Sequence, residues 1–356
     1  MLLKFILILV LIGILAGLVL QQRVLQRCRV SEKIRRQIQI FDCLAVFVLI
    51  ARFMPLPLGS TELVQILALA SLIMLVISTL ILVLVQRWCN RKNTWIFIWL
   101  FCSALLSAGV GLIGWQQART LVVHETQLTL TSQFNHDDLH FTVISDLHLG
   151  TAIQGKQIDS LIRILEETPD QPVLILGDLF DEYTTPSQLQ QFIDKINQSQ
   201  LKTIYMIAGN HEYHQRFHEA YFQQLQASRI QLLRDQSISL GEHLKLLLRQ
   251  DRSQPRQSLD ELIGNSKEDW IVLDHQPKLK EKNPAVLLQL SGHTHAGQVV
   301  PFSLAVRIAY PCVVGHCDTS PQAFVTSGTG TWGLPFRLGT DSEVLRVTLH
   351  FKPQSE

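Results

Sequence analysis

Four apolar stretches in the first third of the chain constrain its fold more than any other feature. They cover residues 2–20, 40–58, 63–85 and 95–115, and the last two contain no Asp, Glu, Lys or Arg. A helix that crosses a bilayer needs about 20 mostly apolar residues, so each stretch is long enough to span a membrane. The sequence therefore predicts a transmembrane domain with four helices over residues 1–120 and a second domain over residues 121–356.

Two of these stretches admit another interpretation. Residues 2–20 carry only Lys4 and have the length of a cleaved signal peptide, although no small-residue cleavage site follows them. Residues 40–58 include Asp42 and Arg52, which lie near the ends of the stretch, where charged side chains reach the membrane interface. Buried core helices of a soluble protein are a third interpretation, and four such apolar windows argue against it.

Charge divides the chain at the same place. Residues 1–120 hold 12 Lys/Arg and 3 Asp/Glu, so the totals of 31 and 30 leave 19 and 27 for the rest, a net charge of +9 against −8. Basic residues concentrate in the loops 21–39 and 86–94, which the positive-inside rule assigns to the cytoplasm. The second domain is therefore expected on the extracytoplasmic side. Its acidic balance argues against nucleic acid as a partner.

The second part alternates short apolar runs with helical stretches. Runs at 141–145, 173–176 and 203–208 are separated by stretches with helical character at 157–167 and 188–198. Further apolar runs occupy residues 270–273, 286–290, 323–327 and 343–350. This alternation predicts an α/β fold in which helices cover a sandwich of sheets.

A polar motif follows each of five of these runs. In chain order they read Asp146-x-His148, Gly177-Asp178-x-x-Asp181, Gly209-Asn210-His211-Glu212, Asp274-His275 and Gly292-His293-Thr294-His295. Ligands bind at the carboxyl ends of strands in α/β sheets, so five motifs in such places predict one shared site. Carboxylate, imidazole and amide groups suit divalent ions such as Mn²⁺, Fe²⁺ or Zn²⁺.

In type and order these motifs resemble those of the calcineurin-like metallophosphoesterase superfamily. The segment 292–298 (GHTHAGQ) is most similar to the membrane-associated bacterial branch, and the resemblance covers about residues 139–350. It implies a β-sandwich flanked by helices, two divalent metal ions, and hydrolysis of a phosphoester by metal-activated hydroxide. It also implies a location in the bacterial inner (plasma) membrane.

The resemblance assigns a role to each matching position. It implies one metal held by Asp146, His148, Asp178 and His295, and a second held by Asp178, Asn210, His275 and His293. It further implies that His211 faces the substrate, where it stabilises phosphoryl charge or protonates the leaving oxygen, and that Asp181 orients His211. A helix N-cap is the alternative for Asp181, and Glu212 is expected to be a solvated or capping carboxylate.

Three features outside the motifs remain open. Arg252 and Arg256 are predicted substrate contacts because Arg matches phosphate geometry, with a solvated surface as the alternative. Cys312 and Cys317 form a disulfide if they lie in an oxidising compartment, or else remain free thiols. Arg337 faces either the site or a structural carboxylate.

The sequence thus predicts a membrane-anchored, metal-dependent phosphohydrolase. A phosphodiesterase that acts on a lipid-linked or envelope phosphoester is favoured, because a protonating His211 is most useful when the leaving group is poor. A phosphomonoesterase of the same fold, a non-catalytic metal-binding scaffold and a transporter with a regulatory domain are the alternatives.

Overall fold

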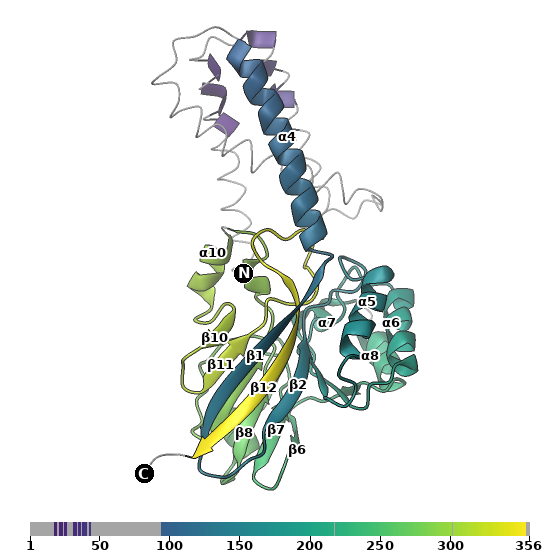
Figure 1. Ribbon diagram of the computed structural model, residues 1–356, viewed down its shortest axis with the longest axis vertical. Helices are drawn as coiled ribbons and strands as arrows, with labels where there is room; N and C mark the ends of the chain where they lie inside the picture. The colour runs from purple at the N-terminus through teal and green to yellow at the C-terminus, as the bar shows by residue number, and fades with distance from the viewer. Residues whose placement is uncertain are drawn as a thin grey trace. The chain divides into compact units, whose positions relative to one another are not determined.

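The computed structural model describes residues 94–353 apart from 217 and 301, together with short stretches between residues 18 and 43. The chain divides into two compact units, Met1–Gln116 and Gln117–Glu356. Helix α4 (Thr94–Gln117) coincides with the expected span at 95–115 (Figure 1). The expected spans at 2–20, 40–58 and 63–85 lie almost wholly outside the described residues.

Membrane-spanning helices are not found in the described part of the chain. Among the residues that are described in full, no helix combines the length and the apolar character needed to cross a bilayer. The predicted four transmembrane helices are therefore not supported by the structure.

The second unit contains two mixed sheets, each with six strands among its described residues. In spatial order, the first sheet comprises β1 (Leu121–Ser132), β12 (Ser342–Pro353), β2 (Leu139–Ile144), β3 (Val173–Ile175), β4 (Ile204–Met206) and β5 (Gln231–Leu232). The second comprises β10 (Gly315–Cys317), β11 (Gln322–Val325), β9 (Val286–Ser291), β8 (Asp269–Leu273), β7 (Leu244–Leu248) and β6 (Gln236–Ser239).

The first and last strands of the unit pair with each other over their full lengths. β1 runs parallel to β12 from Leu121 opposite Ser342 to Ser132 opposite Pro353, and β12 runs antiparallel to β2 (Figure 1). The sequence analysis predicted a strand at 343–350 but no apolar run between residues 121 and 140. The polar, partly exposed face of β1 explains this miss, because only part of the strand carries the expected apolar alternation.

Helices cover the outer faces of the two sheets. They are α5 (Lys156–Leu165), α6 (Pro186–Gln198), α7 (Asn210–His214), α8 (His218–Gln226), α9 (Leu259–Ile263), α10 (Phe302–Ala309) and the 3₁₀ turn η1 (His295–Gly297). Buried side chains of α5, α6 and α8 pack on the first sheet, and those of α9 pack on the second. The expected α/β sandwich with flanking helices is confirmed.

Alternation along the strands builds the core between the sheets. Val143 of β2 faces the second sheet, whereas Ile144 faces the helices, because successive strand residues point to opposite sides. Leu246 of β7 and Leu288 of β9 meet Val143 in the same inter-sheet core. Of the strands that precede ligand motifs, β3 and β8 are buried along their whole lengths, and the polar motif residues follow at their ends.

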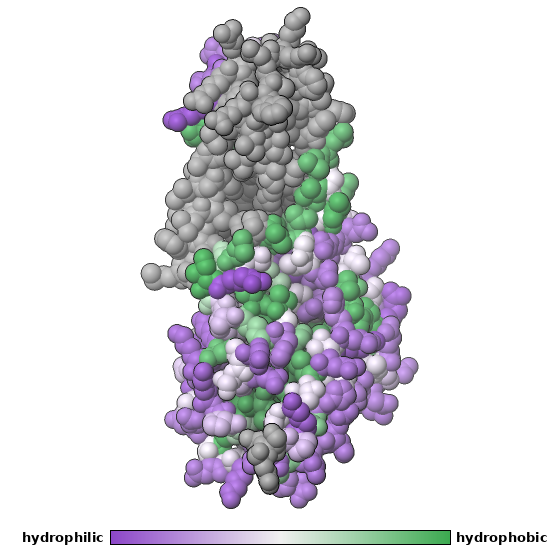
Figure 2. Space-filling view, turned by 60° about the vertical axis from the view of Figure 1, so that its left-hand side comes forward, coloured by the Kyte–Doolittle hydropathy of each residue, from purple (hydrophilic) through white to green (hydrophobic). Residues whose placement is uncertain are grey.

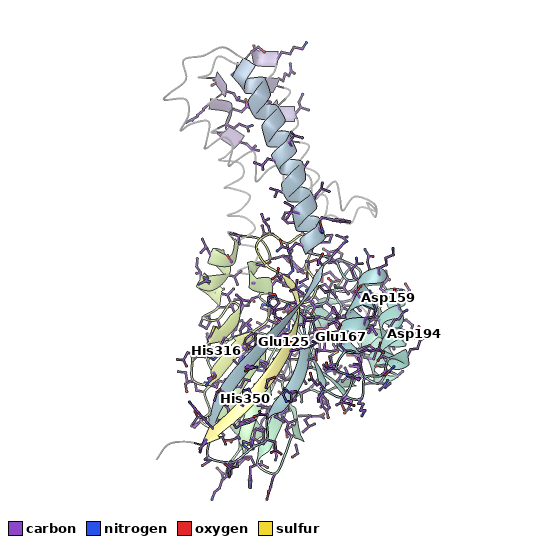
Figure 3. The ribbon with its side chains drawn as sticks, viewed as in Figure 1. Glu125, Asp159, Glu167, Asp194, His316 and His350 are labelled. Carbon is purple, nitrogen blue, oxygen red and sulfur yellow. A yellow bond between two sulfur atoms is a disulfide. The ribbon has the colours of Figure 1, made fainter. Side chains whose placement is uncertain are left out.

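Ion pairs on the outer surface have a local structural role. Arg346 on β12 pairs with Glu125 of β1 at 3.7 Å and with Glu167, which follows α5, at 2.6 Å, and Figure 3 labels both carboxylates. Lys195 of α6 pairs with Asp159 of α5 at 2.9 Å. Such exposed pairs contribute about 0–1 kcal/mol each, so the apolar cores dominate the stability.

Candidate metal centre

The predicted ligands follow strands of both sheets. Asp146 follows β2, Asp178 follows β3 and Asn210 follows β4, and these three strands run parallel to one another. His275 follows β8 and His293 follows β9, which form a parallel pair in the second sheet. The carboxyl ends of both sets of strands therefore meet at one end of the sandwich, where the sequence placed a shared site.

Two groups of ligand atoms converge there. The first cluster is Asp146, His148 and His295, with His295 Nε2 lying 3.3 Å from His148 Nε2 and 3.5 Å from Asp146 Oδ1. Within this cluster the two imidazoles point ring nitrogens at each other. A cation between them would satisfy both nitrogen lone pairs.

The second cluster is Asp178, His275 and His293. His275 Nε2 lies 3.1 Å from Asp178 Oδ2 and 3.2 Å from His293 Nδ1. The same oxygen of Asp178 lies 3.9 Å from His148 Nε2 of the first cluster. Asp178 is thus within reach of both clusters, which is the geometry that a shared ligand requires.

Groups outside the clusters fix the orientation of three imidazoles. His148 Nδ1 lies 3.0 Å from Asp181 Oδ2, and His275 Nδ1 lies 2.7 Å from the carbonyl oxygen of Leu176. His293 Nε2 lies 2.7 Å from the hydroxyl of Tyr310, a residue that the sequence analysis did not single out. Such partners hold a ring so that its other nitrogen faces the metal position.

Asn210 tests whether the site fits a metal pair. Its Oδ1 is buried and has no hydrogen-bond partner among the described residues, whereas nearly all buried polar atoms in proteins have one. An amide oxygen left in this way at the edge of the second cluster matches its predicted role as a ligand. The donor set of carboxylate, imidazole and amide groups therefore fits two divalent cations.

The backbone of the ligand loops is held in a sparsely populated conformation. Five predicted ligands have a positive φ, namely Asp146, His148, Asp178, His293 and His295. Non-glycine residues rarely adopt this region, and such outliers gather at functional sites where the surroundings enforce them. The glycines of the motifs provide the necessary space. A Cβ at Gly209 would collide with the Asp178 carboxylate, and one at Gly292 would collide with that of Asp146.

Burial and charge shift the pKa values of the clustered groups. Burial raises the pKa of Asp146, whereas for Asp178 the charges of His275 and His211 outweigh burial and hold the pKa well below its ordinary value. Burial and the charge of His275 lower the pKa of His293 to about 3. Burial and the charge of His148 lower the pKa of His295. The last two imidazoles are thus neutral at pH 7, as metal ligands must be.

His211 lies beside the clusters and is paired with a different carboxylate from the one expected. The prediction that Asp181 orients it is wrong. Asp181 points to His148, and its other oxygen accepts backbone N–H bonds from Tyr183 and Thr184. His211 Nδ1 instead lies 3.0 Å from Glu182 Oε2, because the turn after Asp181 brings the next side chain round to His211.

The protonated form of His211 is favoured by its surroundings. Burial lowers its pKa, but the charge of Asp178 and the contact with Glu182 outweigh burial and raise the pKa to about 9. The ring packs edge-on against His148, with centroids 5.0 Å apart, and lies 5.9 Å from the ring of Trp332. His211 is thus placed to donate a proton beside the first cluster.

Glu212 is the capping carboxylate that the sequence analysis gave as one of two alternatives, because it accepts from the N–H of Gly209 at the start of α7, and it also ties two ligand loops together. It is fully buried and accepts backbone N–H bonds from Asp178 at 2.9 Å, Leu179 at 2.6 Å, Phe180 at 3.3 Å and Gly209 at 2.7 Å. Burial and the charge of Asp178 raise its pKa to about 7. The carboxylate therefore fixes the backbone at and after Asp178 and directly before Asn210.

Arg252 and Arg256 do not take the position expected of substrate contacts. Each donates to Asp274 Oδ2 at 3.0 Å, and Arg256 also donates to Glu281 Oε1 at 2.8 Å. Their side chains are mostly buried in this network. Asp274 immediately precedes the ligand His275, so both guanidinium groups support a ligand loop from behind.

Arg337 donates mainly to backbone carbonyl oxygens, and neither of its expected partners, the substrate site and a structural carboxylate, is found among its hydrogen-bond partners in the described residues. Its fully buried guanidinium donates to the carbonyl oxygens of His295, Ser327, Gly328 and Gly330. The N–H of Gly330 in turn donates to the carbonyl of Asp146 at 3.0 Å. Arg337 therefore joins loops that carry two members of the first cluster.

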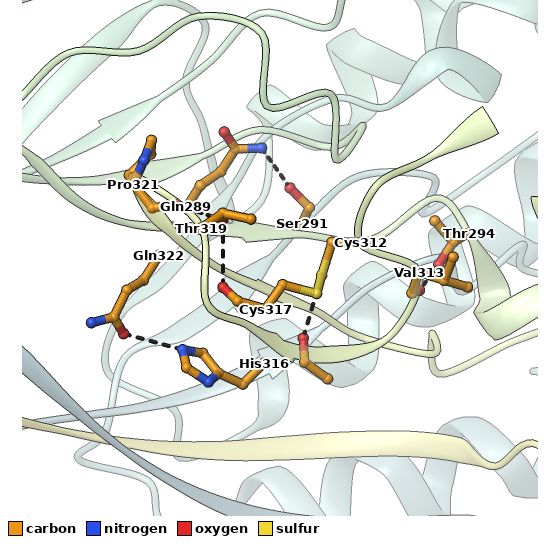
Figure 4. Close-up of a disulfide and its surroundings, with 11 residues drawn as sticks. Gln289, Ser291, Thr294, Cys312, Val313, His316, Cys317, Thr319, Pro321 and Gln322 are labelled. Atoms are coloured by element: carbon orange, nitrogen blue, oxygen red, sulfur yellow. Dashed lines mark hydrogen bonds between the residues drawn. A yellow bond between two sulfur atoms is a disulfide. The ribbon is translucent and has the colours of Figure 1, made fainter. Parts of the chain in front are cut away.

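A disulfide closes the loop that follows α10. Cys312 and Cys317 are bonded, as one of the two sequence alternatives expected (Figure 4). Within the closed loop, the carbonyl of Val313 accepts a hydrogen bond of 2.5 Å from Thr294, which lies between His293 and His295. Covalent closure of this loop therefore braces the last ligand motif.

The family model and the relatives that this chain matches all describe metal-dependent phosphoesterases. Residues 139–297 match the calcineurin-like phosphoesterase family. An uncharacterized metallophosphoesterase from Helicobacter pylori is 33% identical over 232 residues, 61% of this chain and 61% of that protein. A transmembrane protein with metallophosphoesterase domain from Bos taurus is 28% identical over 243 residues, 61% of this chain and 54% of that protein.

The extent of these matches is partial. The chain spans about three-fifths of the length of the Helicobacter relative. Among solved structures, a 5'-nucleotidase precursor from Thermus thermophilus aligns with 60% of this chain and 55% of its own, at 15% identity and a TM-score of 0.36.

Proposed function

Because residues 139–297 are a calcineurin-like phosphoesterase domain, we propose that this protein is a membrane-anchored phosphohydrolase that works with two divalent metal ions. The observation that carries the proposal is the position of Asp178, which belongs to the second cluster with His275 and His293 and also lies 3.9 Å from His148 Nε2 of the first cluster. Mn²⁺, Fe²⁺ and Zn²⁺ all suit these ligands.

The residues around the clusters suggest how a phosphoester is handled. Bound cations at the two clusters would supply Lewis-acid charge and lower the pKa of a water molecule. In its protonated form, His211 donates a hydrogen bond to phosphoryl oxygen or a proton to the leaving oxygen. Glu182 holds the ring in place through Nδ1, which leaves Nε2 for the substrate. This proton matters most for an alkoxide leaving group, so a phosphodiester is the favoured substrate.

Membrane anchoring and the extracytoplasmic location belong to the same proposal. The four apolar stretches, the basic loops between them and the name of the Bos taurus relative all favour an integral membrane protein. The disulfide favours an oxidising compartment, such as the outer side of a bacterial inner membrane. A domain held at that surface meets lipid-linked or envelope phosphoesters, which we propose as its substrates.

Hydrolysis of a chromogenic phosphodiester and of the matching monoester tests the proposal. The full chain, purified in detergent, is assayed with Mn²⁺ beside Asp178→Asn and the control Asp170→Asn, whose exposed side chain pairs with Lys202. Diester turnover that is lost in Asp178→Asn and kept in Asp170→Asn is the expected result. Monoester preference would redirect the proposal to a phosphatase, and no turnover by the folded, metal-loaded protein would favour the scaffold alternative.

A further inference from the structure

Helix α10 turns its large apolar side chains outward. Leu304 is 65% exposed and Ile308 is 88% exposed, and Val300, four residues before Leu304, is 50% exposed. A spacing of four residues places Leu304 and Ile308 on one face of the helix, which is the face that a soluble protein normally covers, and Val300 lies two residues before the helix begins. Figure 2 turns the α10 side toward the viewer and shows hydrophobic residues gathered there on a largely hydrophilic unit. Such a patch marks an interaction surface.

The segment of the chain that carries this patch contains no carboxylate. No Asp or Glu occurs between Glu281 and Asp318, and the only Lys and Arg in that interval are Lys282 and Arg307. Arg307 is exposed and lies next to Ile308. Because residues 121–356 carry a net charge of −8, a segment with two basic residues and no carboxylate differs in charge from the rest of this unit. Its chemistry suits an apolar surface edged with negative charge.

Hydrogen bonds place α10 at the end of the domain where the chain enters from the first unit. Arg119 Nη1, two residues inside the second unit, donates to the carbonyl of Pro335 at 3.5 Å. Three residues later in that loop, the carbonyl of Leu338 accepts from the N–H of Val300 at 3.0 Å. One loop therefore contacts both the first residues of the second unit and the turn that precedes α10.

We propose that the apolar face of α10 formed by Leu304 and Ile308, together with Val300 just before the helix, lies in the interface of an anionic phospholipid bilayer, an inference that rests on the membrane anchoring proposed above. An amphipathic helix of this kind buries its apolar face at the boundary of headgroups and acyl chains, and Arg307 pairs with lipid phosphate. Directly after α10, Tyr310 contacts the ligand His293. The docked helix would thus hold the metal centre at the level of headgroup phosphoesters.

A fluorophore placed on α10 tests the proposal in the full chain. Ile308→Cys is labelled with nitrobenzoxadiazole in a background where the cysteines outside the disulfide are replaced by Ser, namely Cys28, Cys43, Cys89 and Cys102. The protein is reconstituted into vesicles of phosphatidylcholine and phosphatidylglycerol, with and without phosphatidylcholine that carries a nitroxide on its acyl chain. Gln190→Cys, exposed on α6 over the outer face of the first sheet, is the matched control.

The expected result is a blue-shifted emission at position 308 that is quenched by nitroxide lipid, with no quenching at position 190. Unquenched emission at position 308 in protein that floats with the vesicles overturns the inference while anchoring stands. A label at 308 that is shielded from aqueous iodide but not quenched by lipid means that another protein segment covers the helix, which also overturns it. Protein that does not float with vesicles refutes the anchoring itself and the inference with it.

Discussion

Glu182 Oε2 lies 3.0 Å from Nδ1 of His211, and this contact makes Glu182 the partner of the proposed proton donor. We expect Glu182→Gln to lower turnover of a diester with a poor leaving group by about 10- to 100-fold, the usual loss when an orienting partner is removed. A diester with a nitrophenolate leaving group needs little protonation and should be much less affected. Steady-state rates on the two substrates check this.

The adjacent carboxylate separates this effect from metal binding. Asp181 contacts His148, so Asp181→Asn is expected to weaken metal retention and to slow both substrates together. Metal content measured after gel filtration should fall in Asp181→Asn and stay at the wild-type value in Glu182→Gln. Equal metal loss in both variants would contradict the assignment of Asp181 to the ligand His148 and of Glu182 to the proton donor His211.

Glu212→Gln should destabilise the domain. The amide nitrogen of Gln cannot accept a hydrogen bond, so two of the four backbone N–H groups that Glu212 binds would lose their partner inside the protein. Buried donors left in this way cost about 1–3 kcal/mol in unfolding free energy. Thermal unfolding in detergent checks the loss against Glu219→Gln, whose side chain is 81% exposed. Equal unfolding midpoints in the two variants would contradict the prediction.

Tyr310→Phe should weaken metal binding at one cluster only. The variant removes the hydroxyl that lies 2.7 Å from His293 Nε2, and His293 belongs to the second cluster. Loss of such a partner lowers metal affinity by about 10- to 100-fold. Titration with Mn²⁺, followed by electron paramagnetic resonance, should show one tight ion and one weakened ion, and excess Mn²⁺ should restore turnover. Two equally tight ions would rule out this role for Tyr310.

The Arg network predicts how stability depends on pH. Burial raises the pKa of Glu281, but the hydrogen bond from Arg256 and the charges of Arg256, Arg249 and Arg252 outweigh burial and lower the pKa to about 2. The pKa of Glu281 in the folded state is below its ordinary value of 4.5, so the ionised carboxylate stabilises the fold. This stabilisation is fully present above pH 4.5 and is lost as the pH falls towards 2.

Unfolding midpoints of wild type and Glu281→Gln test this sign. The variant should unfold at a lower temperature at pH 7, and the gap should narrow as pH is lowered from 4.5. Glu242→Gln, with a side chain 90% exposed, is the matched control. A gap that widens on acidification would contradict the assignment.

The alternation of apolar runs and polar motifs was enough to predict the sandwich and to bring the ligand side chains to one end of it. This prediction succeeds because the residues directly after an apolar run lie at the carboxyl end of the strand, and ligands bind at that end in α/β sheets. The partners of those ligands were beyond such a reading. Asp181 and Glu182 are neighbours in sequence, and only the turn that follows β3 decides which of them reaches His148 and which reaches His211.

Long-range partners escaped the sequence for a related reason. The roles of Tyr310 and Asp274 depend on partners from distant segments. The hydroxyl of Tyr310 contacts His293, and the carboxylate of Asp274 accepts hydrogen bonds from Arg252 and Arg256. An Arg near a phosphate site and an Arg that pairs with a buried carboxylate look alike in a sequence. The packing of the loop after β7 against β8 distinguishes them.

Each cluster draws its side chains from both sheets, and this has a consequence for how the protein is made. Synthesis runs from the N-terminus, so Asp146, His148 and Asp178 leave the ribosome long before His293 and His295. A chain cut short before β9 would lack a member of both clusters, however well its first sheet had formed. Metal would therefore bind at both clusters only after the whole domain had been synthesised and its two sheets had come together.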